Sequence, residues 1–493
     1  MSFKPEIILG PPGTGKTTFL LDKVEEALAN GVLPRRIGYV AFTKKAATEA
    51  AGRAMERFEL GPKDLPNFRT LHSLAFRMLG LTKNQVLNRQ SIKEFADIMR
   101  LRMSGNVNME EGTISGNLPG DRSFFLVNLA RIRCITVLKQ WQQDPDDLPW
   151  LEVERLYRGL EKFKQARALI DFTDMLERFI DHVDPPELDL LVVDEAQDLS
   201  KMQWRMVMKM ANSAKRTIVA GDDDQAIFRW AGADVEFFIK LKGKRTVLGQ
   251  SYRTPEKVQQ AATDLIRRVT VRTSKKWSAR DEEGTVNYHN DVSALDMSDG
   301  EWLVLSRNNY GLDDAEEQCR REGLFYSRGN RAAVSASTLD TIRAWERARA
   351  GDEIQADSVA KILKHVVHNK QHPPKEGVFT LSDLCSNWGV PTDEIWHEAF
   401  TKMSLTERSY LTAMLRRGEK LTKEPRIKLS TIHSAKGGEA ENVVLHTDMA
   451  RRTYNGMLKQ PEDEIRVFYV GMTRAIKNLH IITPRTKFCF NLL

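Results

Sequence analysis

The first part of the chain alternates between apolar and polar stretches in the order expected for a strand, a turn and a helix. Residues 6–9 (EIIL) are mainly apolar, residues 10–15 are rich in glycine, and residues 16–28 repeat apolar positions at helical spacing. Two later apolar runs, residues 190–193 and 217–220, also end in polar loops. Short runs of this kind are typical of buried parallel strands, so we expect this part of the chain to form an α/β fold with a parallel sheet.

Strand-like runs return in the second half of the chain and predict a second α/β unit. They occur in the segments EWLVLSRNN, RIKLSTIH, ENVVLHT and LHIITP. The segment EDEIRVFYVGMTRAIKNL places apolar residues from Ile465 to Ile476 at helical spacing and is predicted to be a helix. Arg474 is about half a turn out of phase with that apolar stripe, so it is predicted to point away from it.

The stretch 80–167 shows helical periodicity and is predicted to be an insertion. About 175 residues separate the glycine-rich turn from the acidic residues after position 193, more than a few strand–helix repeats require. The segments SIKEFADIMRLRM and WLEVERLYRGLEKFKQARAL repeat apolar residues at helical spacing. The polar segment 104–121 between them is a candidate mobile loop.

A second helical insertion is predicted over residues 350–425. Ser404 and Glu407 have the spacing of a capping box at a helix start. Trp388 and Trp396 are interpreted as core residues of this insertion, because large aromatic side chains are usually buried.

Composition permits several domains and a polyanionic partner. The chain has 493 residues, 41% of them apolar, which is enough for more than one core. Its formal net charge of +7 suits nucleic acid without identifying it. The four cysteines form no CxxC pair, so neither a disulfide framework nor a zinc ribbon is indicated. No apolar run approaches the roughly 18 residues of a membrane span and no signal peptide is recognisable, so a cytoplasmic protein is expected.

The glycine-rich turn has the spacing of a phosphate-binding loop, G-x-x-x-x-G-K-T. Gly13 and Gly15 let backbone N–H groups approach a phosphate, and the helix N-terminus adds the positive end of its dipole. Lys16 is predicted to reach the β- and γ-phosphates, and Thr17 to place its hydroxyl on Mg²⁺. The predicted nucleotide-binding residues of this loop are Gly10, Gly13, Thr14, Gly15, Lys16, Thr17 and Thr18.

The apolar run 190–193 ends at two acidic residues that are suited to hydrolysis. A buried parallel strand would bring Asp194 and Glu195 to the carboxyl edge of the sheet, beside the phosphate-binding loop. Asp194 is predicted to hold Mg²⁺ with Thr17, and Glu195 to orient and deprotonate the attacking water. Gln225 follows another strand candidate and is expected at the same edge, where it would sense the γ-phosphate.

Taken in order along the chain, the motifs resemble those of the UvrD/Rep-like group (SF1A) of superfamily 1 DNA helicases. The matching segments are GPPGTGKT, VAFTKKAATEA, FRTLHSLAFRML, VVDEAQD, VAGDDDQAIFRWAGA, LGQSYRT, LSTIHSAKGGE and FYVGMTRA. They span nearly the whole chain, and the combination of DEAQD, GDDDQ and TRA is highly specific. Only the two insertions lack matching motifs, and the second is short for the family.

The resemblance implies an α/β fold with two RecA-like P-loop motor domains that have parallel sheets, each interrupted by a mainly helical inserted subdomain. ATP would bind between the motors, and single-stranded DNA would lie across them. The expected ranges are 1–80 and 168–246 for the first motor, 81–167 for its insert, 247–349 and 425–493 for the second motor, and 350–424 for its insert.

The resemblance also implies further nucleotide contacts. Tyr252 would stack on the adenine, and Glu439 would contact the ribose. Arg253 and Arg474 would reach the γ-phosphate, where a guanidinium stabilises the charge of a transferred phosphoryl group. The glutamine-containing segment that selects adenine in the family is not matched before Gly10, so the selectivity for ATP stays open.

The loop that contains GDDDQ is predicted to serve both the nucleotide and the strand. Asp222–Asp224 would lie toward the metal and water, whereas the family places base-stacking aromatics at Phe228 and Trp230, and stacking suits any base sequence. The basic run 267–280 is interpreted as a solvated face, with contact to nucleic acid as the alternative. The predicted nucleic-acid contacts are Phe42, Thr43, Lys44, Thr70, His72, Phe228, Trp230 and His433.

These observations predict an ATP-dependent DNA helicase or single-stranded DNA translocase that uses ATP and Mg²⁺, with 3′-to-5′ polarity by the resemblance. The predicted catalytic residues are Lys16, Asp194, Glu195, Gln225, Arg253 and Arg474. The expected partners are single-stranded DNA and single/double-strand junctions, with RNA left open, no membrane, and a monomer acting on DNA. The expected location is the cytoplasm, near the nucleoid, or the host cytoplasm for a viral protein.

Three alternatives are left open by the motifs alone. GPPGTGKT fits an AAA-type remodelling ATPase equally well, although the long gap before the acidic motif argues against it. A translocase that strips proteins from single strands without unwinding would have the same motifs. A nucleic-acid scaffold with an inactive nucleotide site is disfavoured, because all the predicted catalytic residues are present.

Overall fold

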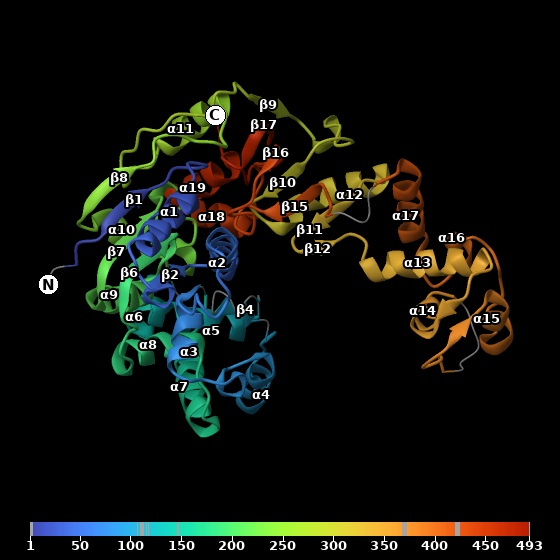
Figure 1. The fold of residues 1–493 in the computed structure, drawn as a ribbon, viewed down its shortest axis with the longest axis horizontal. Coiled ribbons are helices and arrows are strands. Elements are labelled where there is room, and N and C mark those ends of the chain that lie inside the picture. Colours follow the sequence, from blue (N-terminus) through green and yellow to red (C-terminus); the bar gives the residue numbers. More distant parts are fainter. Residues whose placement is uncertain are drawn as a thin grey trace. The chain divides into compact units, whose positions relative to one another are not determined.

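The computed structural model describes most of the chain, and its contacts group the residues into two compact units. The described residues are 3–105, 107–108, 113–114, 116, 118–144, 147–366, 372–419 and 424–492. The first unit comprises Met1–Glu283 with Lys459–Thr473, and the second comprises Gly284–Leu458 with Arg474–Leu493 (Figure 1). Each unit has its own sheet.

The first sheet is parallel and has the strand order β3-β2-β6-β7-β1-β8. Its strands are β1 (Glu6–Leu9), β2 (Ile37–Ala41), β3 (Phe68–Thr70), β6 (Leu188–Asp194), β7 (Ala214–Gly221) and β8 (Lys244–Val247). Leu9 pairs with Gly221, and Ala41 pairs with both Thr70 and Asp194. The carboxyl ends of these strands therefore lie along one edge of the sheet.

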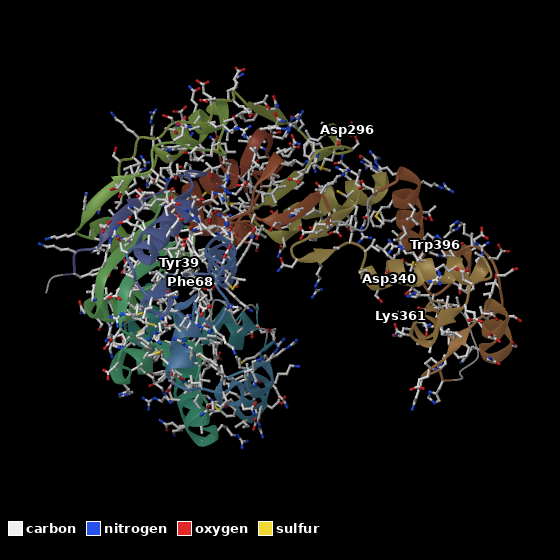
Figure 2. All side chains as sticks on the ribbon, in the orientation of Figure 1. Tyr39, Phe68, Asp296, Asp340, Lys361 and Trp396 are labelled. Atoms are coloured by element: carbon white, nitrogen blue, oxygen red, sulfur yellow. The ribbon has the colours of Figure 1, made fainter. Side chains whose placement is uncertain are left out.

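Helices cover both faces of this sheet because the apolar residues of its strands point alternately to either side. Ile7 and Leu9 pack with residues of α3, α8 and α9, whereas Ile8 packs with residues of α1 and α2. Tyr39 and Phe68 stack on neighbouring strands with their ring centroids 5.4 Å apart (Figure 2). The helices of this unit outside its insertion are α1 (Lys16–Ala29), α2 (Lys44–Phe58), α3 (Leu71–Met78), α8 (Phe172–His182), α9 (Lys201–Ser213), α10 (Val235–Lys240), α11 (Glu256–Ile266) and α19 (Pro461–Met472).

The predicted first insertion is helical and has a core of its own. Phe95 of α4 and Leu156 of α7 are fully buried in that core. The predicted mobile segment 104–121 lies partly outside the described residues, and its described part includes the antiparallel pair β4–β5. The elements of the insertion are α4 (Arg89–Met99), β4 (Val107–Asn108), β5 (Thr113–Ile114), α5 (Pro119–Ile132), α6 (Val137–Gln143) and α7 (Trp150–Arg167).

A buried ion cluster joins this insertion to α8. Lys164 of α7, 4% exposed in its side chain, lies 2.8 Å from carboxylate oxygens of both Asp171 and Asp174. Arg131 of α5 contacts the same two carboxylates at 2.6 and 2.5 Å. Burial alone would raise the pKa of Asp171, but Arg131 and Lys164 hold it well below its ordinary value. The cluster is therefore ionised at neutral pH, and its contribution to stability is lost only as the pH falls through that lowered pKa.

The second sheet has the order β12-β11-β15-β10-β16-β17-β9, and its neighbours pair in parallel except β11 with β12. Helix α12 (Asp313–Glu322) packs against its core through Ala315 and Cys319. Helix α18 (Arg451–Lys459) follows β16. The strands are β9 (Thr285–His289), β10 (Trp302–Ser306), β11 (Tyr326–Arg328), β12 (Arg331–Ala332), β15 (Ile427–Thr431), β16 (Ala440–His446) and β17 (Ala475–Ile482).

The second insertion is also mainly helical, as predicted. Trp388 and Trp396 are 6% and 4% exposed, which confirms their interpretation as core residues. The Ser404 hydroxyl caps α17 by accepting from the backbone N–H of Glu407 at 3.2 Å. The elements are α13 (Ala336–Arg349), β13 (Ile354–Gln355), α14 (Ala356–Ile362), β14 (Val378–Phe379), α15 (Leu381–Trp388), α16 (Trp396–Ala399) and α17 (Leu405–Arg417).

The prediction of one helix through EDEIRVFYVGMTRAIKNL is wrong. Helix α19 ends at Met472, and β17 begins at Ala475. Arg474 lies between the two elements and is 2% exposed, so it is not on the polar face of a helix. Helical periodicity did not locate the end of α19, because the helix is buried on every side over Glu464–Met472. Such a helix has no contrast between an apolar stripe and a polar face.

The α/β class with parallel sheets is confirmed, whereas the predicted domain boundaries remain a prediction. Residues 247–283 and 459–473 make most of their contacts with the first unit, although the predicted ranges assign them to the second motor. Strand β8, which ends at Val247, also pairs with β1 in the first sheet. Within the described part of the chain, no helix has the length and apolarity needed to cross a membrane.

We expect Lys164→Met to destabilise the first unit, because it leaves Asp171 and Asp174 with Arg131 as their remaining buried cation. Removing one partner of a buried ion pair costs about 3–5 kcal/mol of unfolding free energy. Lys162→Met, on an exposed position of the same helix, should change it by less than about 0.5 kcal/mol. Urea unfolding followed by circular dichroism measures both, and equal midpoints for the two variants would contradict the role of the cluster.

Candidate active site

The glycine-rich turn between β1 and α1 has the backbone conformation of a phosphate-binding loop. Gly13 and Gly15 have φ angles of 71° and 72°, which are left-handed and favour glycine. A Cβ at Gly13 would lie 2.4 Å from Cβ of Arg253, so no side chain fits there. The Thr14 hydroxyl donates to the carbonyl of Pro11 at 2.8 Å and holds the turn closed. Successive N–H groups in such a turn can point into a common concavity and donate to an anion.

The start of α1 is suited to a polyphosphate. Among the described residues, no side chain caps its first turn, and that turn contains no acidic residue. The positive end of the helix dipole is therefore not neutralised locally. Thr17 and Asp194 supply oxygen atoms, which Mg²⁺ prefers, beside this turn. The donor set of this loop thus fits a magnesium–triphosphate, with Lys16 on the phosphates and Thr17 and Asp194 on the metal.

Lys16 is a buried cation between two carboxylates. Its Nζ forms an ion pair with Glu195 and lies 3.5 Å from Oδ1 of Asp194. Burial alone would lower the pKa of Lys16, but the charges of Glu195 and Asp194 raise it above its ordinary value. Lys16 is therefore fully charged at neutral pH, as a phosphate ligand must be.

Asp194 is held at the end of β6 by hydrogen bonds from two directions. The Tyr39 hydroxyl donates to its Oδ2 at 2.7 Å, and the backbone N–H of Glu195 donates to its Oδ1 at 2.8 Å. Burial raises the pKa of Asp194 above its ordinary value. These contacts fix the direction of a carboxylate that would bind a cation.

Glu195 is positioned by an unusual backbone and by a side chain that sequence reasoning missed. Its φ of 53° is left-handed, which is uncommon for a residue with a Cβ. The amide of Gln197 donates to its Oε2 at 2.6 Å. The same amide group accepts from the backbone N–H of Asp222 at 3.0 Å through its oxygen. Gln197 lies two positions after Glu195 in DEAQD. Its place in that motif was the feature of the sequence that could have identified it as a site residue.

Gln225 is connected to the same group of residues. Its Nε2 donates to Oδ2 of Asp222 at 2.8 Å. Asp222 therefore contacts Gln225 with its side chain and Gln197 with its backbone. The predicted base Glu195 and the predicted γ-phosphate sensor Gln225 are thus linked through two intervening residues at the carboxyl edge of the sheet.

Tyr252 and Arg253 lie against the phosphate-binding loop. The backbone N–H of Tyr252 donates to the carbonyl of Gly13 at 2.8 Å, and its ring would be 3.8 Å from a Cβ at Gly15. The Tyr252 side chain is 73% exposed, so its ring face is accessible. Gly10 of the loop donates its N–H to the carbonyl of Gly221 at 3.0 Å.

The other two predicted nucleotide contacts belong to the second unit. Glu439 is exposed. Arg474 is buried and donates to the carbonyl of Gly438 at 3.4 Å. The guanidinium of Arg474 is thus held beside the loop that contains Glu439.

The predicted strand contacts of the first unit follow β2, β3 and β7, so they share the edge that holds the acidic residues. Phe42 and Phe228 pack with ring centroids 5.2 Å apart, and Phe228 is only 4% exposed. Trp230 is 45% exposed and stacks on Phe125 of α5, with centroids 6.1 Å apart and planes inclined by 26°. Phe125 was not predicted, because it lies on the insertion, far from any motif.

The remaining predicted strand contacts have local structural roles as well. The hydroxyls of Thr43 and Thr70 cap α2 and α3 by accepting from backbone N–H groups at 3.2 Å. Lys44 is exposed. Burial lowers the pKa of His72 to about 4, so its imidazole is neutral at pH 7 and would contact a strand without charge. His433 follows β15 in the second unit.

The acidic run Asp222–Asp224 does not face solvent, so the prediction that it lies toward water is wrong, whereas its position relative to the metal stays a prediction. All three residues are at most 1% exposed. Lys275 and Arg272, from the basic run, form ion pairs with them. The solvated-face interpretation of that run is therefore also wrong for these two residues. The three aspartates and the Lys275 side chain are buried because they meet each other, which neither local pattern reveals.

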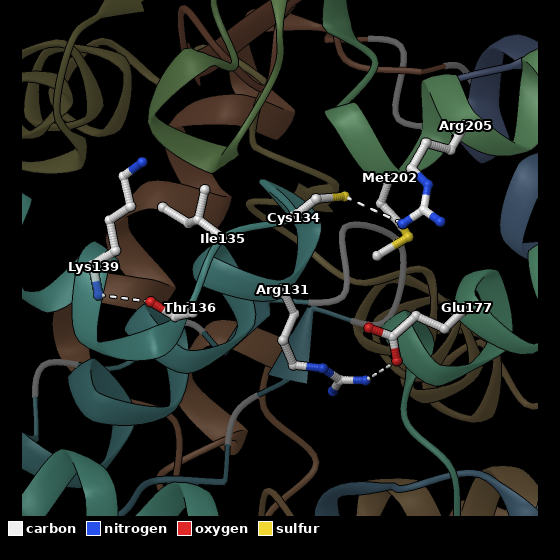
Figure 3. Close-up of a pocket in the computed structure, with 8 residues that line it drawn as sticks. All are labelled: Arg131, Cys134, Ile135, Thr136, Lys139, Glu177, Met202 and Arg205. Atoms are coloured by element: carbon white, nitrogen blue, oxygen red, sulfur yellow. Dashed lines mark hydrogen bonds and ion pairs between the residues drawn. The ribbon is translucent and has the colours of Figure 1, made fainter.

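An open pocket of about 520 Å³ is lined by residues of α5, α6, α8 and α9 and of the α5–α6 connection (Figure 3). Arg131 at its wall is paired with Glu177 at 2.8 Å, and Cys134 lies 4.0 Å from a guanidinium nitrogen of Arg205. Its lining residues are Arg131, Cys134, Ile135, Thr136, Lys139, Glu177, Met202 and Arg205. None of these is a predicted site residue, and we assign the pocket no role.

Two models of helicase domains match this chain over the segments that form the site. A model of the UvrD/REP helicase N-terminal domain matches residues 2–246, and a model of the UvrD-like helicase C-terminal domain matches residues 388–486. The chain belongs to the UvrD/REP helicase family. In this family member, the N-terminal match contains the phosphate-binding loop, DEAQD and GDDDQ, and the C-terminal match contains His433, Glu439 and Arg474.

Individual relatives are distant in sequence. The ATP-dependent DNA helicase PcrA of Staphylococcus epidermidis is 24% identical over 312 residues, which cover 60% of this chain and 42% of that protein. PcrA of Bacillus subtilis is 26% identical over 310 residues, 58% of this chain and 40% of that protein. The matched part is thus under half the length of these PcrA proteins. YjcD of Bacillus subtilis is 22% identical over 595 residues, 98% of this chain and 77% of that protein.

The chain also matches solved structures, one of which is a helicase bound to DNA. A complex of Arterivirus nonstructural protein 10, a helicase, with DNA matches with a TM-score of 0.34 and 11% identity, over 98% of this chain and 62% of that chain. A similarity this low adds nothing to the assignment, which rests on the family models.

We expect Gly13→Ala to weaken ATP binding at least about ten-fold, because its Cβ would lie 2.4 Å from Cβ of Arg253 in the middle of the loop. Gly31→Ala is the matched control: Gly31 has a similar φ of 82° at the end of α1, and nothing lies within 4 Å of its added Cβ. The control has the same backbone strain, of roughly 1–3 kcal/mol, without the collision. Titration with a fluorescent ATP analogue distinguishes the two, and unchanged affinity in Gly13→Ala would count against the loop as the site.

Proposed function

We propose that the protein is an ATP-dependent DNA helicase or single-stranded DNA translocase that moves 3′ to 5′. One observation supports it best: the hydrogen-bonded connection from Glu195 through Gln197 and Asp222 to Gln225 lies at the sheet edge that also presents Phe42 and Trp230. Hydrolytic groups and aromatic faces on one edge are what a nucleotide-driven DNA motor requires.

The proposed hydrolysis step uses residues whose positions are already restrained. Mg²⁺, when bound, would neutralise charge on the β- and γ-phosphates. Lys16 would bind the phosphates, and Glu195 would accept a proton from the attacking water on its carboxylate. Gln225 would orient that water. Arg253 and Arg474 would each place a guanidinium beside the transferred phosphoryl group and stabilise its negative charge. Tyr252 would stack on the base.

The proposed strand grip uses stacking and a few phosphate contacts. Trp230, with Phe125 behind it, offers an exposed ring face, and such faces bind bases of any sequence. Thr43, Lys44 and Thr70 would meet backbone phosphates, and Phe42, His72, Phe228 and His433 complete the proposed contacts. The hydroxyls of Thr43 and Thr70 remain able to donate, because each accepts its helix-capping bond.

The family match favours this proposal over an AAA-type ATPase, because both UvrD models match in chain order. Whether the protein unwinds duplexes or strips proteins from single strands depends on what it does at a junction. Unwinding of duplexes with 3′ or 5′ single-stranded tails separates these activities, and unwinding from the 5′ tail alone would overturn the proposed polarity.

We expect Glu195→Gln to reduce DNA-stimulated ATP turnover by at least about 100-fold while ATP still binds, since an amide cannot accept the proton. Glu187→Gln, the same substitution at a side chain that is 86% exposed, should leave turnover unchanged. Turnover is measured with single-stranded DNA, with single-stranded RNA and without polymer. A wild-type rate that is the same in all three would sink the proposed function.

We expect Trp230→Ala and Phe125→Ala to weaken binding of single-stranded DNA, each by about 1–3 kcal/mol, because one removes a stacking face and the other its support. Tyr288→Ala on β9 is the control, since that ring is equally exposed, at 49%, and is not a proposed contact. Fluorescence anisotropy with a labelled oligothymidine measures the affinities. Wild-type affinity in the Phe125→Ala protein would show that Phe125 does not support the proposed DNA contact of Trp230.

A further inference from the structure

Three consecutive aspartates are buried around one lysine in the first unit. Nζ of Lys275 lies 2.7 Å from Oδ1 of Asp222, 2.5 Å from Oδ1 of Asp223 and 3.0 Å from Oδ2 of Asp224. The four side chains are at most 1% exposed. Burial alone would lower the pKa of Lys275, but the three aspartates raise it above its ordinary value. The lysine is therefore charged inside the protein.

Two arginines complete the charge balance of this cluster. Arg272 contacts Asp224 through two nitrogens, at 2.8 and 2.5 Å. Arg466 of α19 donates to the carbonyls of Asp223 and Val271, at 3.0 and 2.8 Å. Lys275 and Arg272, from the segment that precedes β9, thus pair with the three carboxylates, while Arg466, from a helix near the end of the chain, binds backbone carbonyls beside them.

Stability alone is a poor explanation for this arrangement. The cost of removing these paired ions from water roughly cancels their mutual attraction, and apolar residues of similar volume often stabilise a core at least as well. What such a cluster does supply is a fixed orientation for each member, because moving any one leaves another charge uncompensated.

Asp222 connects the cluster to the proposed hydrolytic groups. Asp222 gives Oδ1 to Lys275 and Oδ2 to Gln225, the latter at 2.8 Å, while its backbone N–H donates to Gln197. Gln197 in turn donates to Glu195 at 2.6 Å. Lys275 therefore holds one oxygen of a carboxylate whose other oxygen holds Gln225.

We propose that Lys275 is a positioning residue for ATP hydrolysis, which acts through Asp222 to orient the amide of Gln225. The inference rests on the proposed function. With the lysine in place, the Asp222 carboxylate cannot rotate, and the Gln225 amide keeps its carbonyl oxygen directed away from Asp222 as an acceptor for the attacking water. Without it, Oδ1 of Asp222 loses its buried cation and retains the hydrogen bond from the backbone N–H of Asp224 at 3.2 Å, so Gln225 is oriented less firmly, although ATP can still bind at the loop.

Arg272 provides the matched control. It is a cation of the same cluster and the same segment, but its side chain pairs with Asp224, whereas the carboxylate that accepts from Nε2 of Gln225 is that of Asp222. Lys275→Met and Arg272→Met each remove one buried cation, and we expect both to lower the unfolding temperature. Only Lys275→Met should reduce kcat for DNA-stimulated ATP hydrolysis, by about ten-fold or more, with KM for ATP changed less than about two-fold. Arg272→Met should keep kcat within about two-fold of the wild type.

A second comparison tests whether the effect passes through Gln225. On a Gln225→Ala background, Lys275→Met should cause no further loss of kcat, because the group it orients is absent. Equal kcat losses in Lys275→Met and Arg272→Met, or a loss of unchanged size on the Gln225→Ala background, would show that the cluster is only structural. If the wild type itself lacks DNA-stimulated turnover, the proposed function fails, which is a different result from either of these.

Lys275→Arg keeps the test decisive if Lys275→Met does not accumulate as folded protein. Arginine retains the charge, but its planar fork cannot place a single ammonium among three carboxylates. We expect an intermediate loss of kcat that disappears on the Gln225→Ala background. A folded Lys275→Arg protein with wild-type kcat and KM would overturn the inference.

Discussion

The carboxyl ends of the parallel strands share one edge of the first sheet, and most candidate groups of the first unit follow from this constraint. Because β1, β2, β3, β6 and β7 run in the same direction, the loops that follow them must meet there. Residues separated by more than 200 positions in sequence, such as Gly10 and Gly221, become hydrogen-bonded neighbours. The chemistry of this protein is thus a property of an edge and not of any single motif.

At that edge, buried carboxylates are neutralised by ion pairs with lysine side chains. Lys16 lies between Asp194 and Glu195, and Lys275 lies between Asp222 and its two neighbours. Each lysine fixes carboxylates that would otherwise repel one another at short range. The two groups are connected through Gln197, so the phosphate-binding loop and the GDDDQ loop form one hydrogen-bonded arrangement.

The sequence was informative wherever the signal is local. Apolar runs located the strands β1, β6 and β7, and glycine spacing located the phosphate-binding loop, because both depend on neighbouring residues. It was misleading where burial comes from a distant partner. Asp222–Asp224 were expected to lie toward metal and water, but they are paired with Lys275 in the interior. Helix α19 was expected to be amphipathic, but it is buried on all sides. Phe125 and Lys275 could not be found from one sequence, since their importance comes from contacts across about 50 to 100 positions.

The backbone of Glu195 has a consequence for how this protein could be improved. Its left-handed φ is better suited to glycine or asparagine, which would relieve a local strain of about 1–3 kcal/mol. Neither of those residues can place a carboxylate on Lys16 and Gln197. Selection for stability alone would therefore favour replacement of Glu195 and would remove the proposed general base with it, so thermostability screens of this protein should keep residue 195 unchanged.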